Sequence, residues 1–257
     1  MPTFAVANQK GGVGKTTTVV NLGAYLGALG ARVLLVDCDA QANTTGFLGV
    51  DEAVPSLYEV LVEGVPAVDA VVATGTKGVE LLPASADLAG ADIELFQTGQ
   101  PNGVLKEALA SLRDQYSYIF LDCPPSLGVV TVNALVAADA VLVPVQCEYL
   151  ALEGLARLMN TLDRIRSTAN PSLQVFGLVM TMYDARTVLS SQVAEEVRRH
   201  YPALTFETVI PRNVRLSEAP SFGCSILDYD PYSRGAEAYR ALALDVASRA
   251  PGLRSSA

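Results

Sequence analysis

Short apolar runs alternate with helical patterns along most of this chain. Apolar runs of four to seven residues with few polar interruptions are typical of buried parallel strands, and they occur at 4–7, 32–37, 79–82, 118–122, 140–145 and 175–181. Between them, apolar residues recur at helical spacing over 16–29, 56–62, 104–115, 127–137, 152–167, 188–200 and 233–249. This alternation predicts an α/β fold: a doubly wound, mostly parallel sheet that binds its ligands at the carboxyl ends of the strands.

The length of the chain suits one large domain. Its 257 residues are 50% apolar, which is enough for a sizeable core. We expect a single domain over 1–250 with a short tail over 251–257, and loops at 46–55 and 74–78. No apolar run approaches the ~18 residues of a membrane span, and the N-terminus lacks the basic start and apolar stretch of a signal peptide. The protein is therefore expected in the cytoplasm.

Cysteine and histidine exclude several kinds of site. The four cysteines, Cys38, Cys123, Cys147 and Cys224, show no C-x-x-C spacing, and three of them follow apolar runs. Reduced, partly buried thiols are the expected state. The only histidine, His200, ends the helical pattern over 188–200 and is expected to be solvated. Histidine-dependent catalytic triads and histidine-rich metal sites are thereby excluded.

A glycine-rich loop follows the first apolar run. Residues 8–17 read NQKGGVGKTT, and such a loop points successive backbone N–H groups at phosphate oxygens while the next helix adds its positive dipole end. Lys15 is predicted to bridge the β- and γ-phosphates, and the Thr16 hydroxyl to hold Mg²⁺. The alternative is a glycine-rich turn that binds nothing, but the strand before the loop and the helix after it, which Gly30 closes, favour nucleotide binding. The predicted nucleotide contacts are Lys10, Gly11, Gly12, Val13, Gly14, Lys15, Thr16 and Thr17.

The loop carries a second lysine. Gln9 stands where the common pattern G-x-x-x-x-G-K-[ST] has its first glycine, so this pattern is not met. The variant K-G-G-x-G-K-[ST], which begins at Lys10, is met instead. It is the signature of the deviant Walker A class of P-loop ATPases.

Two acidic positions at strand ends fit a nucleotide hydrolase. Asp122 ends an apolar run and precedes Cys-Pro-Pro, as a Walker B aspartate that holds a Mg²⁺-bound water does. A helix-capping aspartate is the alternative, and the phosphate loop favours the Mg²⁺ role. The second cluster, residues 37–45 with the sequence DCDAQANTT, suits a switch segment that positions the attacking water against the γ-phosphate.

Motifs with a shared known pattern occur over nearly the whole length of the chain. They are NQKGGVGKTT at 8–17, DxDxQxN at 37–43, DCPPS at 122–126, PVQCEY at 144–149 with ALEG at 151–154, TMYDAR at 181–186 and VIPRNVRLSEAP at 209–220. In these motifs the chain resembles the ParA/Soj family of chromosome- and plasmid-partition ATPases, within the MinD/ParA group. The resemblance implies an ATP-sandwich homodimer in which Lys10 reaches the partner's nucleotide, ATP/ADP and Mg²⁺ as cofactors, and weak basal hydrolysis supported by Asp39. It also implies that Pro211 and Asn213 hold the adenine. The family pattern usually has proline and glycine where this chain has Ala40 and Ala42.

Charge bears on a DNA partner. The net charge of −9 argues against a general attraction to DNA, because DNA affinity depends on Lys and Arg. Residues 186–257 nevertheless hold nine arginines against eight acids, whereas residues 1–185 hold nine basic and nineteen acidic residues. Arg186, Arg212, Arg215 and Arg234 are candidates for one basic face that a dimer would double, with surface salt bridges as the alternative. The resemblance implies DNA contacts for Arg186 and Arg215.

These features predict an ATP-dependent DNA-partition ATPase. The ATP-bound homodimer would bind double-stranded DNA without sequence specificity, associate with the nucleoid, and be released when a ParB/Spo0J-type partner stimulates hydrolysis. One alternative is a MinD-like membrane-cycling ATPase, but residues 242–254 do not supply the basic amphipathic helix it needs, so no stable membrane association is expected. Another is a metabolic P-loop enzyme of the dethiobiotin synthetase or iron–sulfur carrier type, and the absence of paired C-x-x-C cysteines counts against the carrier.

Overall fold

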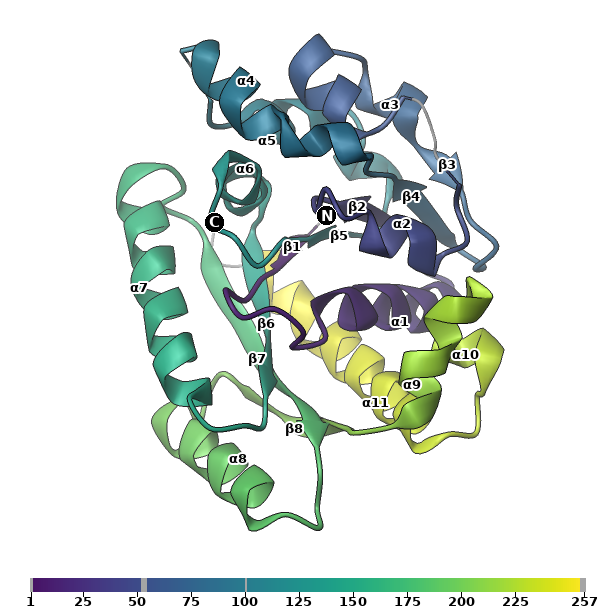
Figure 1. Cartoon of the computed structure of the whole chain (residues 1–257), viewed down its shortest axis with the longest axis vertical. Coiled ribbons are helices and arrows are strands. Elements are labelled where there is room, and N and C mark those ends of the chain that lie inside the picture. Colours follow the sequence, from purple (N-terminus) through teal and green to yellow (C-terminus); the bar gives the residue numbers. More distant parts are fainter. Residues whose placement is uncertain (1, 52–54, 100, 255–257) are drawn as a thin grey trace.

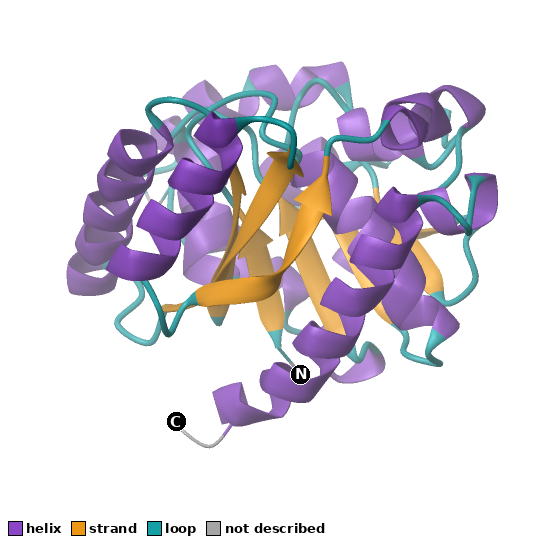
Figure 2. Ribbon diagram, turned by 90° about the horizontal axis from the view of Figure 1, so that it is seen from below, coloured by secondary structure: helices purple, strands orange, loops and turns teal. Residues whose placement is uncertain are grey.

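An eight-stranded sheet forms the centre of the molecule, and helices cover both of its faces (Figures 1 and 2). The structure is a computed structural model that describes residues 2–51, 55–99 and 101–254. The strand order is β3-β4-β2-β5-β1-β6-β7-β8, and all neighbouring strands are parallel except β3 and β4. The strands are β1 (Thr3–Val6), β2 (Val33–Asp37), β3 (Val72–Ala73), β4 (Val79–Leu82), β5 (Tyr118–Asp122), β6 (Ala140–Gln146), β7 (Gln174–Tyr183) and β8 (Thr205–Pro211).

Two cores lie on the two faces of this sheet. Successive residues of a strand point to opposite faces, so in β1 Ala5 packs with one core while Phe4 and Val6 pack with the other. The Ala5 core is covered by α5, α6, α7 and α8, and the Phe4 core by α1 and α11. The helices are α1 (Lys15–Ala28), α2 (Asn43–Phe47), α3 (Ala67–Ala70), α4 (Ala91–Gln97), α5 (Val104–Leu109), α6 (Val129–Ala137), α7 (Ala151–Thr168), α8 (Val188–His200), α9 (Val214–Glu218), α10 (Ile226–Tyr229) and α11 (Arg234–Arg249), with shorter turns η1 (Glu59–Glu63), η2 (Ala86–Ala89), η3 (Arg113–Gln115), η4 (Ala219–Phe222) and η5 (Ala250–Arg254).

The predicted α/β fold with a doubly wound, mostly parallel sheet is confirmed. The six predicted strands are present with small shifts at their ends, and the helix predicted over 188–200 has the bounds of α8. The helix predicted over 104–115 is wrong as one element, because α5 ends at Leu109 and a separate 3₁₀ turn, η3, follows. The strands β3 and β8 and the short helices α2, α4, α9 and α10 were not predicted.

Two predicted irregular segments are corrected in part. The loop expected over 46–55 begins inside α2, and residues 52–54 lie outside the described residues. The tail expected over 251–257 starts within the 3₁₀ turn η5, and residues 255–257 are likewise outside the described part. The loop over 74–78 is confirmed.

The carboxyl ends of three central strands meet at one edge of the sheet. Asp122 at the end of β5 is in register with Val6 of β1 and with Asp37 of β2. Two carboxylates and the glycine-rich loop that follows β1 are thereby gathered at one edge, where open α/β sheets bind their ligands.

The remaining sequence expectations concern single residues and membrane spans. Cys38, Cys123 and Cys147 are buried, Cys224 is half-buried, and all four are free thiols. Burial raises the pKa of Cys147 to about 12, which keeps this thiol protonated. His200 is exposed at the end of α8, as expected. Within residues 2–51, 55–99 and 101–254, no helix has both the length and the apolar character to cross a membrane.

Candidate nucleotide-binding site

The glycine-rich loop forms a cradle between β1 and α1. Gly12 and Gly14 have φ angles of 72° and 88°, in the left-handed region that glycine adopts at little cost. A Cβ atom added at Gly11 or Gly12 would meet nothing within 4 Å, so the loop borders open space. Because α1 begins at Lys15, its first N–H groups and the positive end of its dipole point toward the same space. The cradle fits a phosphate chain.

Two residues without a predicted role anchor this cradle to the sheet. Asn8 Nδ2 donates to the Pro144 carbonyl at 2.7 Å, and Asn8 Oδ1 accepts from the Lys10 amide at 3.0 Å. Thr181 Oγ1 on β7 donates to the Val13 carbonyl at 2.8 Å. Asn8 and Thr181 stood in the motifs quoted from the sequence, but their anchoring roles depend on strands that are distant along the chain.

Lys15 is a buried cation without a carboxylate partner. Its Nζ donates to the Lys10 carbonyl at 3.3 Å, and it forms no ion pair with any residue that the structure describes. Desolvation by burial lowers the pKa of Lys15, and the charge of Asp122 opposes this effect only in part. A buried cation is stabilised when an anion arrives. The side chain is therefore placed to bind a ligand phosphate.

Asp122 has one oxygen that is bonded and one that is not. Its Oδ2 accepts hydrogen bonds from Thr16 Oγ1 and Thr44 Oγ1, each at 2.7 Å. Its Oδ1 is buried and has no hydrogen-bond partner among the residues that the structure describes. Burial raises the pKa of Asp122 to about 6, against the opposing effect of the two threonine hydrogen bonds. A free carboxylate oxygen beside a phosphate cradle suits a water molecule on a metal ion.

The donor set around Asp122 fits a hard cation that keeps most of its water. In the described part of the chain, no three His, Cys, Asp or Glu side chains gather in a way that could hold a metal ion. Magnesium is commonly bound by one or two protein oxygens with waters and substrate phosphates as the other ligands. The Thr16 hydroxyl and Asp122 provide protein oxygens of this kind.

Asp37 holds the switch segment in place. Its Oδ2 accepts from the Thr45 amide at 2.9 Å and from Thr45 Oγ1 at 2.8 Å, and its Oδ1 accepts from the Asp39 amide at 3.1 Å. Burial and the nearby charge of Asp122 raise the pKa of Asp37 to about 7. The segment also contains Ala42 at a φ of 51°, a left-handed conformation unusual for alanine. Asp37 is thus a structural residue that fixes the switch segment, and Asp39 lies two residues further along that segment.

Two adjoining cavities lead away from the cradle. The first has a volume of about 530 Å³ and is bordered by the phosphate loop, the switch segment and the segment after β5. The second, about 270 Å³, is bordered by the segments after β7 and β8. Both cavities touch Gly14, Thr17 and Met182, so they adjoin and form one continuous site. The first is lined among others by Gly11, Gly12, Lys15, Thr16 and Asp39, and the second by Pro211, Arg212 and Asn213.

Most of the residues predicted to bind the nucleotide lie around this site, but the Lys10 side chain does not. Val13 is buried, with its carbonyl bonded to Thr181. The Lys10 side chain is 46% exposed, does not line either cavity, and forms an ion pair with Glu148 at 3.1 Å. Arg212 lies 3.6 Å from the other carboxylate oxygen of Glu148. Glu148, which was not among the predicted site residues, thus engages two cations beside the nucleotide cavities.

The two arginines predicted to contact DNA are exposed and paired within the chain. Arg186, after β7, donates to Asp184 through Nε at 2.9 Å and through Nη2 at 2.8 Å. These bonds hold the pKa of Asp184 down at about 2. Arg215 on α9 donates to Glu218 at 2.8 Å and lies 3.4 Å from Asp230. Each guanidinium group therefore has a carboxylate of the same chain as a competitor for any phosphate that it contacts.

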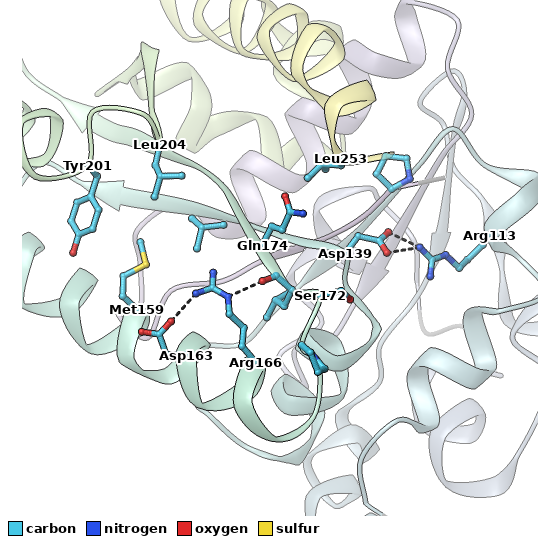
Figure 3. A pocket seen from close by; sticks show the side chains of 14 residues that line it. Arg113, Asp139, Met159, Asp163, Arg166, Ser172, Gln174, Tyr201, Leu204 and Leu253 are labelled. Atoms are coloured by element: carbon cyan, nitrogen blue, oxygen red, sulfur yellow. Dashed lines mark hydrogen bonds and ion pairs between the residues drawn. The ribbon is translucent and has the colours of Figure 1, made fainter. Parts of the chain in front are cut away.

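A larger cavity lies at the amino ends of the strands, opposite the nucleotide site, and is lined by different chemical groups (Figure 3). Its volume is about 830 Å³. Its arginines are already neutralised, since Arg113 pairs with Asp139 and Arg166 pairs with Asp163. It has no glycine-rich loop and no buried unpaired cation among its lining residues, so it lacks the features that bind phosphate.

Comparisons with known proteins agree with this site. A sequence model described as an AAA domain matches residues 1–175. The chain is 53% identical to the chromosome partitioning protein ParA of Caulobacter vibrioides, covering 96% of this chain and 94% of the relative. It is 53% identical to the chromosome-partitioning ATPase Soj of Thermus thermophilus, covering 96% and 95%. A crystal structure of cobyrinic acid a,c-diamide synthase from Mycobacterium smegmatis, with bound ADP and magnesium, superposes with a TM-score of 0.84 at 41% identity, covering 96% of this chain and 94% of the other.

Proposed function

The chain belongs to the ParA/Soj family of chromosome-partitioning ATPases, and on this premise we propose that it is an ATP-driven DNA-partition switch. ATP binding produces a homodimer, the dimer binds double-stranded DNA without sequence specificity, and a ParB/Spo0J-type partner stimulates hydrolysis and release. The ATPase activity follows from the family, and residues of the site support the proposed contacts with nucleotide and DNA.

The nucleotide assignment rests on two buried groups that lack a partner among the described residues: the Lys15 ammonium has no counterion, and Asp122 Oδ1 has no hydrogen-bond donor. The backbone from Lys10 to Thr17 and the Lys15 side chain bind the phosphates, and Pro211 and Asn213 contact the adenine in the second cavity. Thr16 and a water on Asp122 are the groups that hold Mg²⁺, which when bound neutralises charge on the phosphates. Asp39 orients the attacking water from the switch segment.

Lys10 and the exposed arginines provide the remaining steps. A half-exposed lysine paired with an exposed carboxylate exchanges partners at little cost, so Lys10 is free to bind a nucleotide phosphate of a second subunit. Arg186 and Arg215 contact DNA phosphates, and the dimer doubles their number. Because the chain carries a net charge of −9, the monomer binds DNA weakly, and binding depends on ATP.

A metabolic role is the second candidate, because the Mycobacterium structure at 41% identity bears the name of a biosynthetic enzyme. The continuous site described above accounts for a nucleotide, and a further cavity that borders Asp39 has a volume of about 180 Å³. That volume is small for a bulky second substrate. The partition function is therefore preferred.

The test is retention of random-sequence duplex DNA at low salt with ATP, with ADP and without nucleotide. The wild-type protein should retain DNA only with ATP, and Arg215→Glu should lose retention while still binding ATP. Arg32→Glu is the matched control, because Arg32 is exposed and paired with Glu80 but lies at the opposite edge of the sheet. A wild-type protein that shows no ATP-dependent retention would contradict the proposal.

A further inference from the structure

Thr44 is a buried residue of the switch segment whose individual role the sequence did not indicate. It is the second residue of α2, and its side chain is 0% exposed. Its Oγ1 donates to Asp122 Oδ2 at 2.7 Å, although the two residues are 78 positions apart along the chain. A hydroxyl that donates to a carboxylate at this distance forms a charge-assisted hydrogen bond, which is stronger than a bond between neutral groups. Thr44 therefore acts directly on the carboxylate of the candidate metal site.

The two hydrogen bonds that Asp122 accepts decide which of its oxygens is available to a ligand. Thr16 and Thr44 both donate to Oδ2, whereas Oδ1 has no partner among the described residues. A carboxylate held by two donors on one oxygen rotates only if both bonds break, so Oδ1 is the oxygen left to accept from a metal-bound water. Groups that orient metal-binding side chains in this way matter for affinity, and their loss commonly weakens metal binding by about 10- to 100-fold.

The two threonines that hold Asp122 differ in what else they contact. Thr16 lines the first nucleotide cavity, and its hydroxyl oxygen is itself a predicted ligand of Mg²⁺. Thr44 lines neither nucleotide cavity, and among the described residues its hydroxyl bonds to Asp122 alone. The Thr44 hydroxyl is therefore placed to orient the carboxylate rather than to bind a ligand.

Thr44 also joins Asp122 to the segment that carries Asp39. Asp37 and Asp122 are in register on the neighbouring strands β2 and β5. They accept hydroxyl hydrogen bonds from consecutive residues of α2, since Thr45 donates to Asp37 and Thr44 donates to Asp122. Two strand ends thus fix the first turn of α2, and the residues just before this turn border the nucleotide cavity through Asp39.

We propose that Thr44 is a positioning residue of the magnesium site, which holds Asp122 with Oδ1 free for the metal-bound water and fixes the start of α2 to the same carboxylate. This inference rests on the proposed function, in which Thr16 and a water on Asp122 hold Mg²⁺. Metal affinity then depends on a residue that contacts neither the metal nor the nucleotide. A movement of the switch segment that withdraws Thr44 also releases Asp122, so the order of this segment and the affinity for the metal change together.

The test measures ADP binding to the full-length protein by titration calorimetry, once with Mg²⁺ and once with excess chelator. The quantity compared between variants is the ratio of these two ADP affinities, which we call the Mg²⁺ ratio. Valine has nearly the shape of threonine but no hydroxyl, so Thr44→Val removes the bond to Asp122. In this variant the Mg²⁺ ratio should fall by about tenfold, the lower end of the loss typical for such orienting groups. The affinity for ADP without Mg²⁺ should stay unchanged.

Further variants separate orientation of Asp122 from a general effect on the fold. Thr44→Ser keeps the hydroxyl and should restore the wild-type Mg²⁺ ratio, whereas Thr44→Ala should not. Serine and alanine differ only in the hydroxyl, so this pair repeats the test if the valine variant does not fold. Thr45→Val is the matched control, because it removes the neighbouring hydroxyl of the same helix but spares the bond to Asp122. Its Mg²⁺ ratio should equal that of the wild type.

Hydrogen exchange of the backbone amides tests the link to the switch segment. In the wild-type protein, the amides of α2 should exchange more slowly with ADP and Mg²⁺ than with ADP alone, because a fixed Asp122 holds Thr44. This difference should vanish in Thr44→Val. No difference in the wild type, or an equal difference in the valine variant, overturns the link.

A wild-type Mg²⁺ ratio in both Thr44→Val and Thr44→Ala overturns the positioning role. An equal fall in Thr45→Val also overturns it, because it would show a general loosening of the switch segment. A wild-type protein whose ADP affinity does not respond to Mg²⁺ would contradict the proposed metal site and this inference with it. If the wild type responds and the Thr44 variants respond equally, only the inference fails and the metal site stands.

Discussion

In the proposed contact with DNA, the carboxylate that pairs with Arg186 competes with the phosphate for this arginine. Both Nε and Nη2 of Arg186 are bonded to Asp184, so a DNA phosphate either displaces this carboxylate from the bidentate edge of the guanidinium or contacts the remaining Nη1 side. Asp184 also places a negative charge beside the incoming phosphate. Its pKa of about 2 means that the carboxylate stays ionised at every pH at which DNA binding is measured. Acidification within that range therefore does not release Arg186.

Asp184→Asn should raise the affinity for DNA. Asparagine keeps an oxygen for the Arg186 amide, which donates to Asp184 Oδ1 at 3.0 Å, but removes the charge. Exposed ion pairs are weak, so the gain should be about two- to fivefold for each subunit and about four- to twenty-five-fold for a dimer that uses two copies. The slope of log affinity against log salt should become steeper by up to about 0.9 for each released arginine.

The assay is ATP-dependent binding of random-sequence duplex DNA by fluorescence anisotropy over a salt series. Asp163→Asn is the control, because it removes one exposed carboxylate that pairs with an arginine at the opposite edge of the sheet. Equal gains in both variants would show a general effect of net charge. An unchanged or lower affinity in Asp184→Asn would show that Asp184 presents Arg186 to DNA rather than restraining it, and the reasoning would be wrong.

Four further predictions follow from the nucleotide site. Lys15→Ala should abolish ATP binding, whereas Lys10→Ala should keep most of it and lose ATP-induced dimerisation, measured by light scattering; normal dimerisation of the Lys10 variant would contradict its action on a second subunit. Asp39→Ala should bind ATP and accumulate as a long-lived dimer with turnover about 10²-fold lower, and near-wild-type steady-state turnover would remove Asp39 from the mechanism. Burial raises the pKa of Asp122 to about 6, and the metal site needs the ionised carboxylate. Mg²⁺-dependent nucleotide affinity should therefore be constant above about pH 6 and fall about tenfold per pH unit below it. Titration calorimetry between about pH 5 and 8 that finds no change in affinity would exclude Asp122 as the titrating group. Thr45→Val removes the donor to Asp37 Oδ2 and the acceptor of the Ala84 amide, so the free energy of unfolding in urea should fall by about 2–4 kcal/mol, and a loss below about 1 kcal/mol would show that water replaces both bonds.

The sequence predicted those parts of the fold in which one pattern of apolar residues continues long enough to be recognised. The strands β1 and β2 are buried throughout, β5 and β6 are buried except for one end residue each, and all four are apolar runs, as expected for a parallel sheet with both faces covered. In β8, at the edge of the sheet, Thr205, Glu207 and Thr208 interrupt the apolar residues, and Glu207 is exposed. Short helices such as α2 and α9 contain five residues each, fewer than two turns, and carry no readable period.

The nucleotide site was predictable where each residue belongs to a short sequence motif and the pairing of parallel strands brings these motifs together. The sequence places Lys15 and Thr16 in one loop and Asp122 at a strand end, and parallel pairing of β1, β2 and β5 brings them together. The ion pairs that the side chains form within the chain were not predictable in the same way. The ion pair between Lys10 and Glu148 joins residues 138 positions apart, and no local pattern indicates which carboxylate a flexible lysine reaches.

That ion pair also bears on the proposed exchange of Lys10 between Glu148 and the nucleotide of a second subunit. Lys10 and Glu148 have side chains that are 46% and 43% exposed, so water screens their attraction and the pair contributes little to stability. A buried pair would hold Lys10 too firmly for exchange, since breaking it would leave an uncompensated charge. In the proposed dimer, the nucleotide of the second subunit offers Lys10 several phosphate charges in a site from which water is excluded, where the same attraction is stronger. Glu148 therefore keeps Lys10 in place within the monomer without competing strongly once a second subunit binds ATP.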